Sequence, residues 1–449
     1  MKAIPFVHEG LGNSSYLIGL GDGRAALVDP DRSVERYLRA ADTQGWRIVA
    51  ALETHIHADF VSGAHELLAR EGAMLFIPEG SGSRLPHQAA RAGERIRLDG
   101  VEFEPIASPG HTPEHMSYVL RTPSAPPSLF SGGSLIVGGA ARTDLIAPDR
   151  TEELTRAQYR TINQSFASLP DETLLYPTHG GGSFCSTGSG EERASTLGGE
   201  RATNPALAVK TEEDFVRWFP GTFPGTPAYY SRMRAFNQAG PRLRDQIAMP
   251  RPLLPESFER AMADAHIIDV RPVDAYAKAH IYGSLHIPFR DSFAVWLGWL
   301  APYDAPLLLV ADAEAVERVV DECLLVGYEN FGGVLDGGIE AWIASGRPVS
   351  STRLLDGEQA LQLAREGATV IDVREPSEHA AGHLPDATLI PLGEVVHASL
   401  NDTRDVPVVV YCGHGERAST AASILERRGY EGVANVRGGY DALSRARSA

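Results

Sequence analysis

The sequence contains few cysteines: only Cys185, Cys323 and Cys412 occur among its 449 residues. Three thiols that are odd in number and far apart do not form the disulfide framework that stabilises small secreted domains. Each cysteine must therefore be interpreted as a single thiol, from the residues around it.

Long apolar runs and an excess of basic residues are also lacking. No stretch approaches the roughly 18 consecutive apolar residues of a membrane-spanning helix, and the N-terminus has no long apolar segment of a signal peptide. The 41 Lys and Arg residues are outnumbered by 58 Asp and Glu residues, and the net charge of −17 disfavours attraction to DNA or anionic membranes. We expect a cytoplasmic protein that binds neither nucleic acid nor membranes; whether it forms homo-oligomers stays open.

A chain of this length is expected to contain two to four domains, and its alternating short strands and helices indicate the mixed α/β class. Several prolines and arginines in the segment 241–255 predict a linker. We predict three domains, at residues 1–240, 255–350 and 355–449.

The most informative motif is Thr54-His-Ile-His-Ala-Asp-Phe60, which follows a run typical of a buried strand, Arg47–Glu53. In an extended or irregular loop, His55, His57 and Asp59 can converge on one point, as the ligands of a metal ion of borderline softness do. The alternative is that all three are ordinary loop residues.

Two further histidines are predicted at strand ends. His111 lies in a turn bounded by Pro and Gly, which would hold its ring stiffly, and His179 follows the strand-like run Thr173–Thr178. We predict His111 as the third metal ligand and His179 as a fourth candidate.

Together with Ser131-Gly-Gly-Ser-Leu135, these motifs resemble the metallo-β-lactamase fold, an αββα sandwich in which two sheets pack face to face with helices outside. Thr54–Asp59 and Ala141–Asp144 resemble more narrowly the persulfide dioxygenases of that superfamily. The resemblance covers about residues 1–235 and implies the oxidation of glutathione persulfide at a mononuclear Fe(II) centre.

Two departures from the family pattern reduce the ligands available to a second metal ion. The hydrolases of this fold have a second histidine where this sequence has Phe60, and the family has a metal-binding Asp where this sequence has Gly133. A binuclear hydrolase is therefore disfavoured. Three interpretations stay open: an Fe(II) persulfide dioxygenase with altered ligation, a mononuclear hydrolase whose three histidines would suit Zn, and a domain that has lost its metal.

Two other residues of this domain have both a functional and a structural interpretation. The guanidinium of Arg142 could bind a substrate carboxylate, or it could form a salt bridge with Asp144 or Asp149. Cys185 lies six residues after His179 and could present sulfur near the metal, or it could be an unreactive loop cysteine.

The C-terminal part of the sequence contains an internal repeat, in which Ile267–Pro288 parallels Val370–Pro391. Each copy alternates strands and helices, which predicts a small parallel-sheet α/β domain. The copies resemble rhodanese domains.

The second copy keeps a reactive loop between a strand, Pro407–Tyr411, and a helix. Backbone N–H groups of the loop and the positive end of the helix would stabilise Cys412 as a thiolate or persulfide, and Arg417 would attract a substrate anion. The loop of six residues resembles that of sulfurtransferases. Its remaining residues, expected to bind substrate, are Gly413, His414, Gly415 and Glu416.

The first copy has Ala311-Asp-Ala-Glu-Ala315 in place of this loop, so it lacks a nucleophile, and Cys323 in a helical pattern is expected to be buried and inert. The chain thus resembles a fusion of a persulfide dioxygenase, a pseudo-rhodanese and an active rhodanese. We predict that it oxidises a low-molecular-weight persulfide to sulfite and thiol, and that Cys412 transfers sulfane sulfur among thiol, sulfite and thiosulfate. If the first domain holds no metal, only the sulfurtransferase would be active.

Overall fold

The structure is a computed structural model that describes residues 3–122, 125–188, 190, 192–400 and 406–448. Residues 1, 2 and 449, at the ends of the first and third predicted domains, lie outside the described ranges. The chain divides into two compact units, Met1–Ile247 with Cys323–Gly327 and Ala248–Glu322 with Tyr328–Ala449. None of the helices within the described ranges has the length and apolar character needed to cross a membrane.

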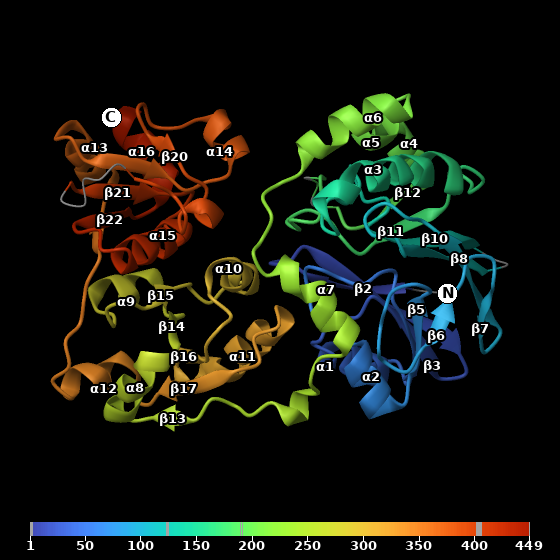
Figure 1. Ribbon diagram of the computed structural model, residues 1–449, viewed down its shortest axis with the longest axis horizontal. Coiled ribbons are helices and arrows are strands. Elements are labelled where there is room, and N and C mark those ends of the chain that lie inside the picture. The colour runs from blue at the N-terminus through green and yellow to red at the C-terminus, as the bar shows by residue number, and fades with distance from the viewer. Residues whose placement is uncertain (1–2, 123–124, 189, 191, 401–405, 449) are drawn as a thin grey trace. The chain divides into compact units, whose positions relative to one another are not determined.

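The first unit contains two six-stranded sheets (Figure 1). The first sheet has the strand order β1 (Ala3–His8), β2 (Asn13–Gly21), β3 (Arg24–Val28), β4 (Arg47–Leu52), β5 (Met74–Pro78) and β6 (Gln88–Ala90). The second has the order β12 (Ser195–Thr196), β11 (Leu174–Pro177), β10 (Ala125–Gly132), β9 (Met116–Thr122), β8 (Val101–Ala107) and β7 (Ile96–Leu98). The helices are α1 (Glu35–Thr43), α2 (Ala64–Glu71), α3 (Thr151–Arg160), α4 (Leu197–Thr203), α5 (Pro205–Ala208), α6 (Glu212–Trp218) and α7 (Tyr230–Ala239).

Successive residues of the strands face opposite layers, as the two-residue period of a strand requires. Ile18 of the first sheet and Tyr118 of the second belong to one buried cluster between the sheets. Their neighbours Leu17 and Val119 belong instead to separate clusters that pack against helices on the outer faces. The αββα sandwich predicted from the sequence is confirmed.

The second unit contains two five-stranded parallel sheets with the same topology. The first copy has the order β13 (Pro252–Leu253), β17 (Phe331–Leu335), β16 (Leu307–Val310), β14 (His266–Asp269) and β15 (Leu285–His286), with α8 (Pro255–Ala261), α9 (Val273–Lys278), α10 (Phe293–Leu300), α11 (Val316–Leu325) and α12 (Gly338–Ala344). The second has the order β18 (Arg353–Leu355), β22 (Val433–Val436), β21 (Val408–Tyr411), β19 (Thr369–Asp372) and β20 (Thr388–Leu389), with α13 (Gly357–Arg365), α14 (Pro376–Ala381), α15 (Glu416–Arg427) and α16 (Gly439–Ser448). The repeat seen in the sequence is therefore a repeat of the fold.

The two copies also share a buried ion pair at the end of one strand. Nε of Arg271 donates to Asp269 Oδ1 over 2.9 Å, and Nε of Arg374 donates to Asp372 Oδ1 over 2.9 Å. In each copy the same guanidinium also donates to a backbone carbonyl 8 residues further along the chain. This pair is part of the common framework of the two domains.

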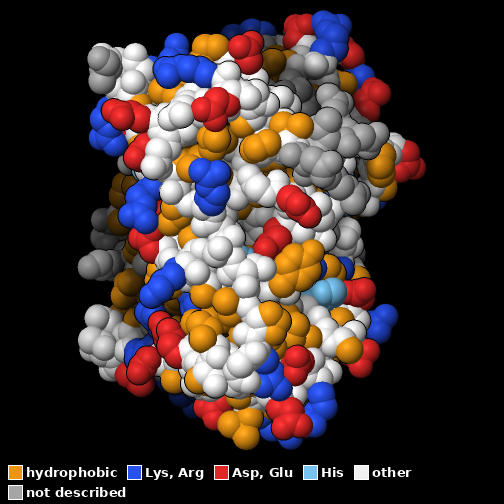
Figure 2. Space-filling model, turned by 90° about the vertical axis from the view of Figure 1, so that its left-hand side faces the viewer, with side chains coloured by type: hydrophobic (Ala, Val, Ile, Leu, Met, Phe, Trp, Pro, Cys, Tyr) orange, Lys and Arg blue, Asp and Glu red, His pale blue; other side chains and the backbone are white. Residues whose placement is uncertain are grey.

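Figure 2 shows one face of the molecule, where Lys and Arg side chains lie among Asp and Glu side chains with hydrophobic side chains between them. Among the described residues on this face, charges of one sign do not form an extended patch.

Candidate functional site

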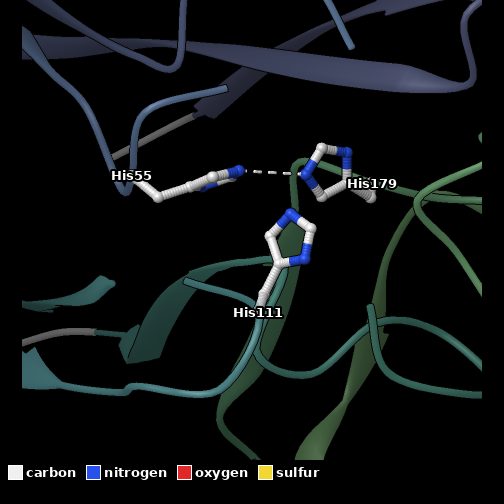
Figure 3. A group of neighbouring side chains, drawn as sticks. All are labelled: His55, His111 and His179. Carbon is white, nitrogen blue, oxygen red and sulfur yellow. Dashed lines mark hydrogen bonds between the residues drawn. The ribbon is translucent and has the colours of Figure 1, made fainter. Parts of the chain in front are cut away.

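The four predicted histidines meet at the ends of their strands. His55 and His57 follow β4, His111 follows β8, and His179 follows β11; all four side chains are buried. The ring centroid of His55 lies 4.2 Å from that of His57 and 4.8 Å from that of His111. The rings of His111 and His179 are 5.1 Å apart, and Figure 3 shows His55, His111 and His179 turned toward one another.

The outer nitrogen of His55 is fixed by a chain of hydrogen bonds. The Thr54 hydroxyl donates to Asp29 Oδ2 over 2.6 Å, so its oxygen accepts from Nδ1 of His55 over 2.9 Å. Nε2 of His55 therefore carries a lone pair and faces Nε2 of His179 at 3.2 Å (Figure 3). Burial and the neighbouring imidazoles hold the pKa of His55 well below its usual value, so the ring is neutral, as a metal ligand must be.

His111 is oriented in the same way. Its Nδ1 donates to the backbone carbonyl of Arg142 over 2.6 Å, which leaves the lone pair on Nε2, a buried atom without a hydrogen-bond partner. Burial and the charge of His179 together lower the pKa of His111 to about 3, against the opposing effect of the Arg142 carbonyl. Anchoring the outer nitrogen of an imidazole is how proteins aim the inner nitrogen at a metal ion.

His57 has the opposite orientation. Its Nε2 lies 2.9 Å from Glu53 Oε2 and 3.3 Å from Asp29 Oδ1, whereas its Nδ1 is buried without a hydrogen-bond partner. Burial lowers the pKa of His57, but Asp29 and Glu53 outweigh that effect and raise it to about 10. A metal ion at Nδ1 would displace the proton that this pKa places there.

Asp59 is the clearest sign of an ion-binding role. Its carboxylate is buried, and neither oxygen has a hydrogen-bond partner, although Oδ2 lies 3.1 Å from Nδ1 of His179. Burying a charged group without such partners costs several kcal/mol, which a cation would offset. Three groups of side chains offer ligand atoms within 4.8 Å of one another: His55 with His111 and His179; Asp29 with His55 and His57; and His57 with Asp59 and His179. The residues present therefore fit a metal ion.

At Phe60 and Gly133, the two positions that depart from the family pattern, other side chains occupy the space around the missing ligands. The Phe60 ring stacks on the His57 ring with centroids 4.2 Å apart. A Cβ atom on Gly133 would lie only 2.7 Å from His111 Cδ2, so the space of the missing side chain has closed. A second metal ion thus lacks ligands at both positions.

His115 is a buried histidine of this region to which the sequence analysis assigned no role. Its Nε2 accepts the backbone N–H of Gly133 over 3.0 Å, and its Nδ1 lies 2.9 Å from Ser108 Oγ and 3.0 Å from Ser134 Oγ. Both nitrogens are therefore engaged, and His115 supports the backbone turn rather than offering a lone pair. Asp29 and Glu53 were also missed; their only signal in the sequence is their place at the ends of apolar strands.

Arg142 has the structural role that was the alternative to substrate binding. Its guanidinium makes a bidentate salt bridge with Asp144 over 2.7 and 2.8 Å and is buried. The remaining N–H groups donate to the carbonyls of Phe184, Pro224 and Gly225 and to the hydroxyl of Thr226. The prediction that Arg142 binds a substrate carboxylate is not supported, because every donor is occupied.

Cys185 is fully buried, and burial together with the charge of Asp59 raises the pKa of its thiol well above the usual value. A protonated thiol is a poor nucleophile. This environment favours the unreactive interpretation of Cys185, and a role in presenting sulfur stays a prediction.

The reactive loop of the second copy lies between β21 and α15. Cys412 is buried, and the backbone N–H of Gly415 donates to its Sγ over 3.0 Å. Gly415 has φ +122°, a conformation that favours glycine and that aims this N–H at the sulfur. Gly413 is half-buried, the side chain of His414 is 76% exposed, and Glu416 begins α15.

Arg417 is engaged in a contact that the sequence analysis missed. Its two terminal nitrogens donate to the two carboxylate oxygens of Glu378, over 2.6 and 2.7 Å. Burial lowers the pKa of Arg417, but Glu378 and the neighbouring Cys412 raise it, so the guanidinium is charged. A comparison of the two sequence repeats could have pointed to Glu378, because the first copy has Ala275 at that position and also lacks the cysteine.

The first copy has no comparable group at the same place. β16 ends at Val310 as β21 ends at Tyr411, so Ala311 takes the position of Cys412. Asp312 and Glu314 of the following turn are exposed to solvent.

The comparisons with known proteins agree with these two regions. The profile of the metallo-beta-lactamase superfamily matches residues 8–179, and the profile of the rhodanese-like domain matches residues 254–345 and 356–446. The human mitochondrial persulfide dioxygenase is 30% identical over 202 residues, which cover 44% of this chain and 73% of the relative. A hydroxyacylglutathione hydrolase of Polaromonas is 34% identical over 171 residues, 37% of this chain and 62% of that protein, so this chain spans less than two thirds of its length.

One solved structure is similar over most of the chain. It is a metallo-beta-lactamase from Staphylococcus aureus, with a TM-score of 0.67 and 29% sequence identity, and the similarity covers 75% of this chain and 98% of that one. Because 75% of this chain is more than the length of the sandwich, the similarity extends into the C-terminal part of the chain.

Proposed function

The N-terminal part of the chain belongs to the metallo-beta-lactamase superfamily and its C-terminal part consists of rhodanese-like domains, and on this premise we propose that it oxidises a low-molecular-weight persulfide and transfers sulfane sulfur. In the proposed oxidation, one O2 and one water convert the terminal sulfur of a persulfide, such as glutathione persulfide, to sulfite, and the thiol is released with two protons. The persulfide dioxygenase among the relatives supports this choice of substrate.

The observation that carries the proposal is the buried Asp59 carboxylate, whose oxygens accept no hydrogen bond and lie close to the nitrogens of buried imidazoles. His57, Asp59 and His179 provide two imidazoles and one carboxylate, the set that non-haem Fe(II) oxygenases use. His55 and His111 complete the cluster. A bound Fe(II) ion would supply the one-electron chemistry that O2 activation requires.

The residues around these ligands control where protons are held. Asp29 accepts the Thr54 hydroxyl, which keeps the proton of His55 on Nδ1, and the Arg142 carbonyl keeps the proton of His111 on Nδ1. Phe60 stacks on the His57 ring, at the position where the hydrolases of this fold have a second histidine. These hydrogen bonds thus direct the inner lone pairs of His55 and His111 toward one ion.

In the proposed transfer, the Cys412 thiolate attacks the sulfane sulfur of a donor. The S–S bond of the donor breaks, the leaving thiol or sulfite takes its electron pair, and Cys412 holds a persulfide until a thiol or sulfite acceptor attacks its terminal sulfur. The N–H of Gly415, 3.0 Å from Sγ, stabilises the negative charge on this sulfur.

The test is O2 consumption with glutathione persulfide by the full chain loaded with Fe(II), loaded with Zn(II), or freed of metal. We expect consumption only with Fe(II), at about one ion per chain. Cys412→Ser is the matched control, because it should keep O2 consumption and lose sulfur transfer. Consumption by the metal-free protein would contradict the proposed oxidation.

A second candidate is a mononuclear hydrolase of a glutathione thioester. It is favoured by the three imidazoles His55, His111 and His179, a set that suits Zn(II) with one open position, and by the hydroxyacylglutathione hydrolases among the relatives. Thioester hydrolysis by the Zn(II) form without O2 would favour this candidate. A chain that binds neither ion would leave only the sulfurtransferase.

A further inference from the structure

The pair formed by Glu378 and Arg417 changes the charge of the site around Cys412. The Arg417 guanidinium lies beside the loop, since its Nη2 would be 3.5 Å from a Cβ atom on Gly413. Each of its terminal nitrogens donates one N–H to Glu378, so Nε–H and the second N–H of each terminal nitrogen remain for a substrate anion. The single positive side chain of the loop is therefore neutralised by a carboxylate.

A second carboxylate lies close to the same guanidinium. Burial raises the pKa of Glu375, and the charge of Arg417 opposes this, whereas the charge of Glu378 adds to it. Glu378 itself is ionised: burial raises its pKa, but the hydrogen bonds from Arg417 lower it below the usual value. The region around Arg417 therefore has no excess of positive charge.

The two rhodanese-like copies show that this pair accompanies the reactive loop rather than the fold. The framework pair of an Asp and an Arg two residues later is present in both copies. By the same alignment of strands, Ala275 and Val316 of the first copy take the positions of Glu378 and Arg417. The copy without the nucleophile lacks both members, so the pair is not needed to form the domain.

We propose that Glu378 determines donor specificity at Cys412, by holding Arg417 so that the site disfavours dianionic donors such as thiosulfate and favours persulfides. Thiosulfate brings two negative charges to the loop, whereas the reacting end of a persulfide brings one. This inference rests on the proposed sulfur transfer at Cys412. Glu378 does not touch the reacting sulfur, so it is a positioning residue.

The test is a single-turnover experiment on the full chain with thiosulfate or glutathione persulfide as donor, in which mass spectrometry follows the gain of one sulfur atom on Cys412. Glu378→Gln should increase the loading rate from thiosulfate about tenfold, which corresponds to 1.4 kcal/mol, and change the rate from persulfide less than about threefold. Added salt should slow loading of the variant from thiosulfate, because screening weakens the attraction by the unpaired guanidinium of Arg417, and should change the wild-type rate less.

Two variants separate charge from structure. Glu378→Asp keeps the charge, so it should keep the preference of the wild type for persulfide. Glu358→Gln removes the same charge from an exposed position at the start of α13 and should leave both rates unchanged.

The outcomes distinguish this inference from the proposed function. Equal losses with both donors in Glu378→Gln would mean that Glu378 only supports the loop, and this would overturn the inference. Loading of the wild type with an unchanged donor ratio in the variant would also overturn it. Absence of loading in the wild type with either donor would instead refute sulfur transfer at Cys412.

Discussion

Two regions of this chain depart from the residue pattern of their families, and the structure shows that the departures differ in kind. In the first rhodanese-like copy, Ala311 takes the place of Cys412, the predicted nucleophile, and the acidic side chains of the turn that follows are exposed to water. In the metal-binding region, Gly133 and Phe60 replace expected ligands, yet buried donor atoms without partners remain at Asp59, His57 and His111.

The comparison shows how the loss of family residues changes the electrostatic cost of folding at each site. The position of Ala311 holds no buried charge, so it needs no ligand to offset an electrostatic cost of folding. A cluster that buries an unpartnered carboxylate among lone pairs is unfavourable unless a cation binds or protons are taken up. The absence of family residues alone does not distinguish the position of Ala311 from the histidine cluster. The hydrogen bonds of the remaining residues do distinguish them.

The largest expected effect tests the contrast between the two rhodanese-like copies. Cys412→Ser should lower sulfur transfer by about a thousandfold or more, because it removes the nucleophile. The double variant Ala311→Cys with Cys412→Ser should show no sulfur transfer, since the first copy has Val316 at the position of Arg417. Transfer to a thiol acceptor measures both. Activity of the double variant would show that the loop of the first copy can still stabilise a reactive thiolate.

The next effect tests the framework that the copies share. Asp269→Asn and Asp372→Asn each remove one member of a buried pair and should lower the stability of their own copy by about 3 kcal/mol. Hydrogen exchange at β14 and β19 reports the two copies separately. Glu256→Gln, in the exposed pair with Arg260, is the control and should cost less than about 1 kcal/mol. Strong protection in both Asp variants would show that the framework pair is not stabilising.

An effect of similar size should distinguish the copies by pH. His286 of the first copy is buried and donates Nε2–H to the Arg271 carbonyl over 2.8 Å, whereas the second copy has Leu389 at the same position on the next strand. Burial lowers the pKa of His286 from 6.5 to about 4, so the unfolded chain takes up a proton first as the pH falls. The first copy should therefore lose about 3 kcal/mol between pH 6.5 and 4, and His286→Leu should remove this slope. Hydrogen exchange corrected for intrinsic rates measures it; equal acid sensitivity of both copies in the wild type would contradict it.

Much of the fold was predictable because periodicity reports which face of a strand is buried. The alternation through Leu17 and Ile18 predicts two opposed layers, and the repeated Asp-Val-Arg segments predict two equal domains. The same patterns predict that the histidines follow strands. Their convergence depends on how the two sheets pack, because β4 belongs to one sheet and β8 and β11 to the other.

The partners of individual side chains were not predictable in this way. Arg142 is bound by carbonyls and a hydroxyl 82 to 84 residues further along the chain, and Glu378 meets Arg417 across 39 residues. These contacts depend on how separate loops and helices pack, which local spacing does not record. His115 shows the same limit, because its role comes from the backbone N–H of Gly133, 18 residues away.

The smallest effect tests whether the buried side-chain atoms without hydrogen-bond partners, at His57, Asp59 and His111, belong to a metal site. Thr54→Val keeps the shape of the side chain but removes the hydroxyl that accepts from His55 Nδ1, so the lone pair of His55 Nε2 is no longer fixed. Loss of such an outer partner lowers metal affinity by about 10- to 100-fold. Competition with a chelator, for Fe(II) under anaerobic conditions and for Zn(II), measures the affinity. Ser108→Ala is the matched control, because that hydroxyl contacts His115 and should leave the affinity unchanged. Equal affinities of Thr54→Val and the wild type would show that His55 is not a ligand. Failure of the wild type to bind either ion would show that the departures at Gly133 and Phe60 mark a lost site.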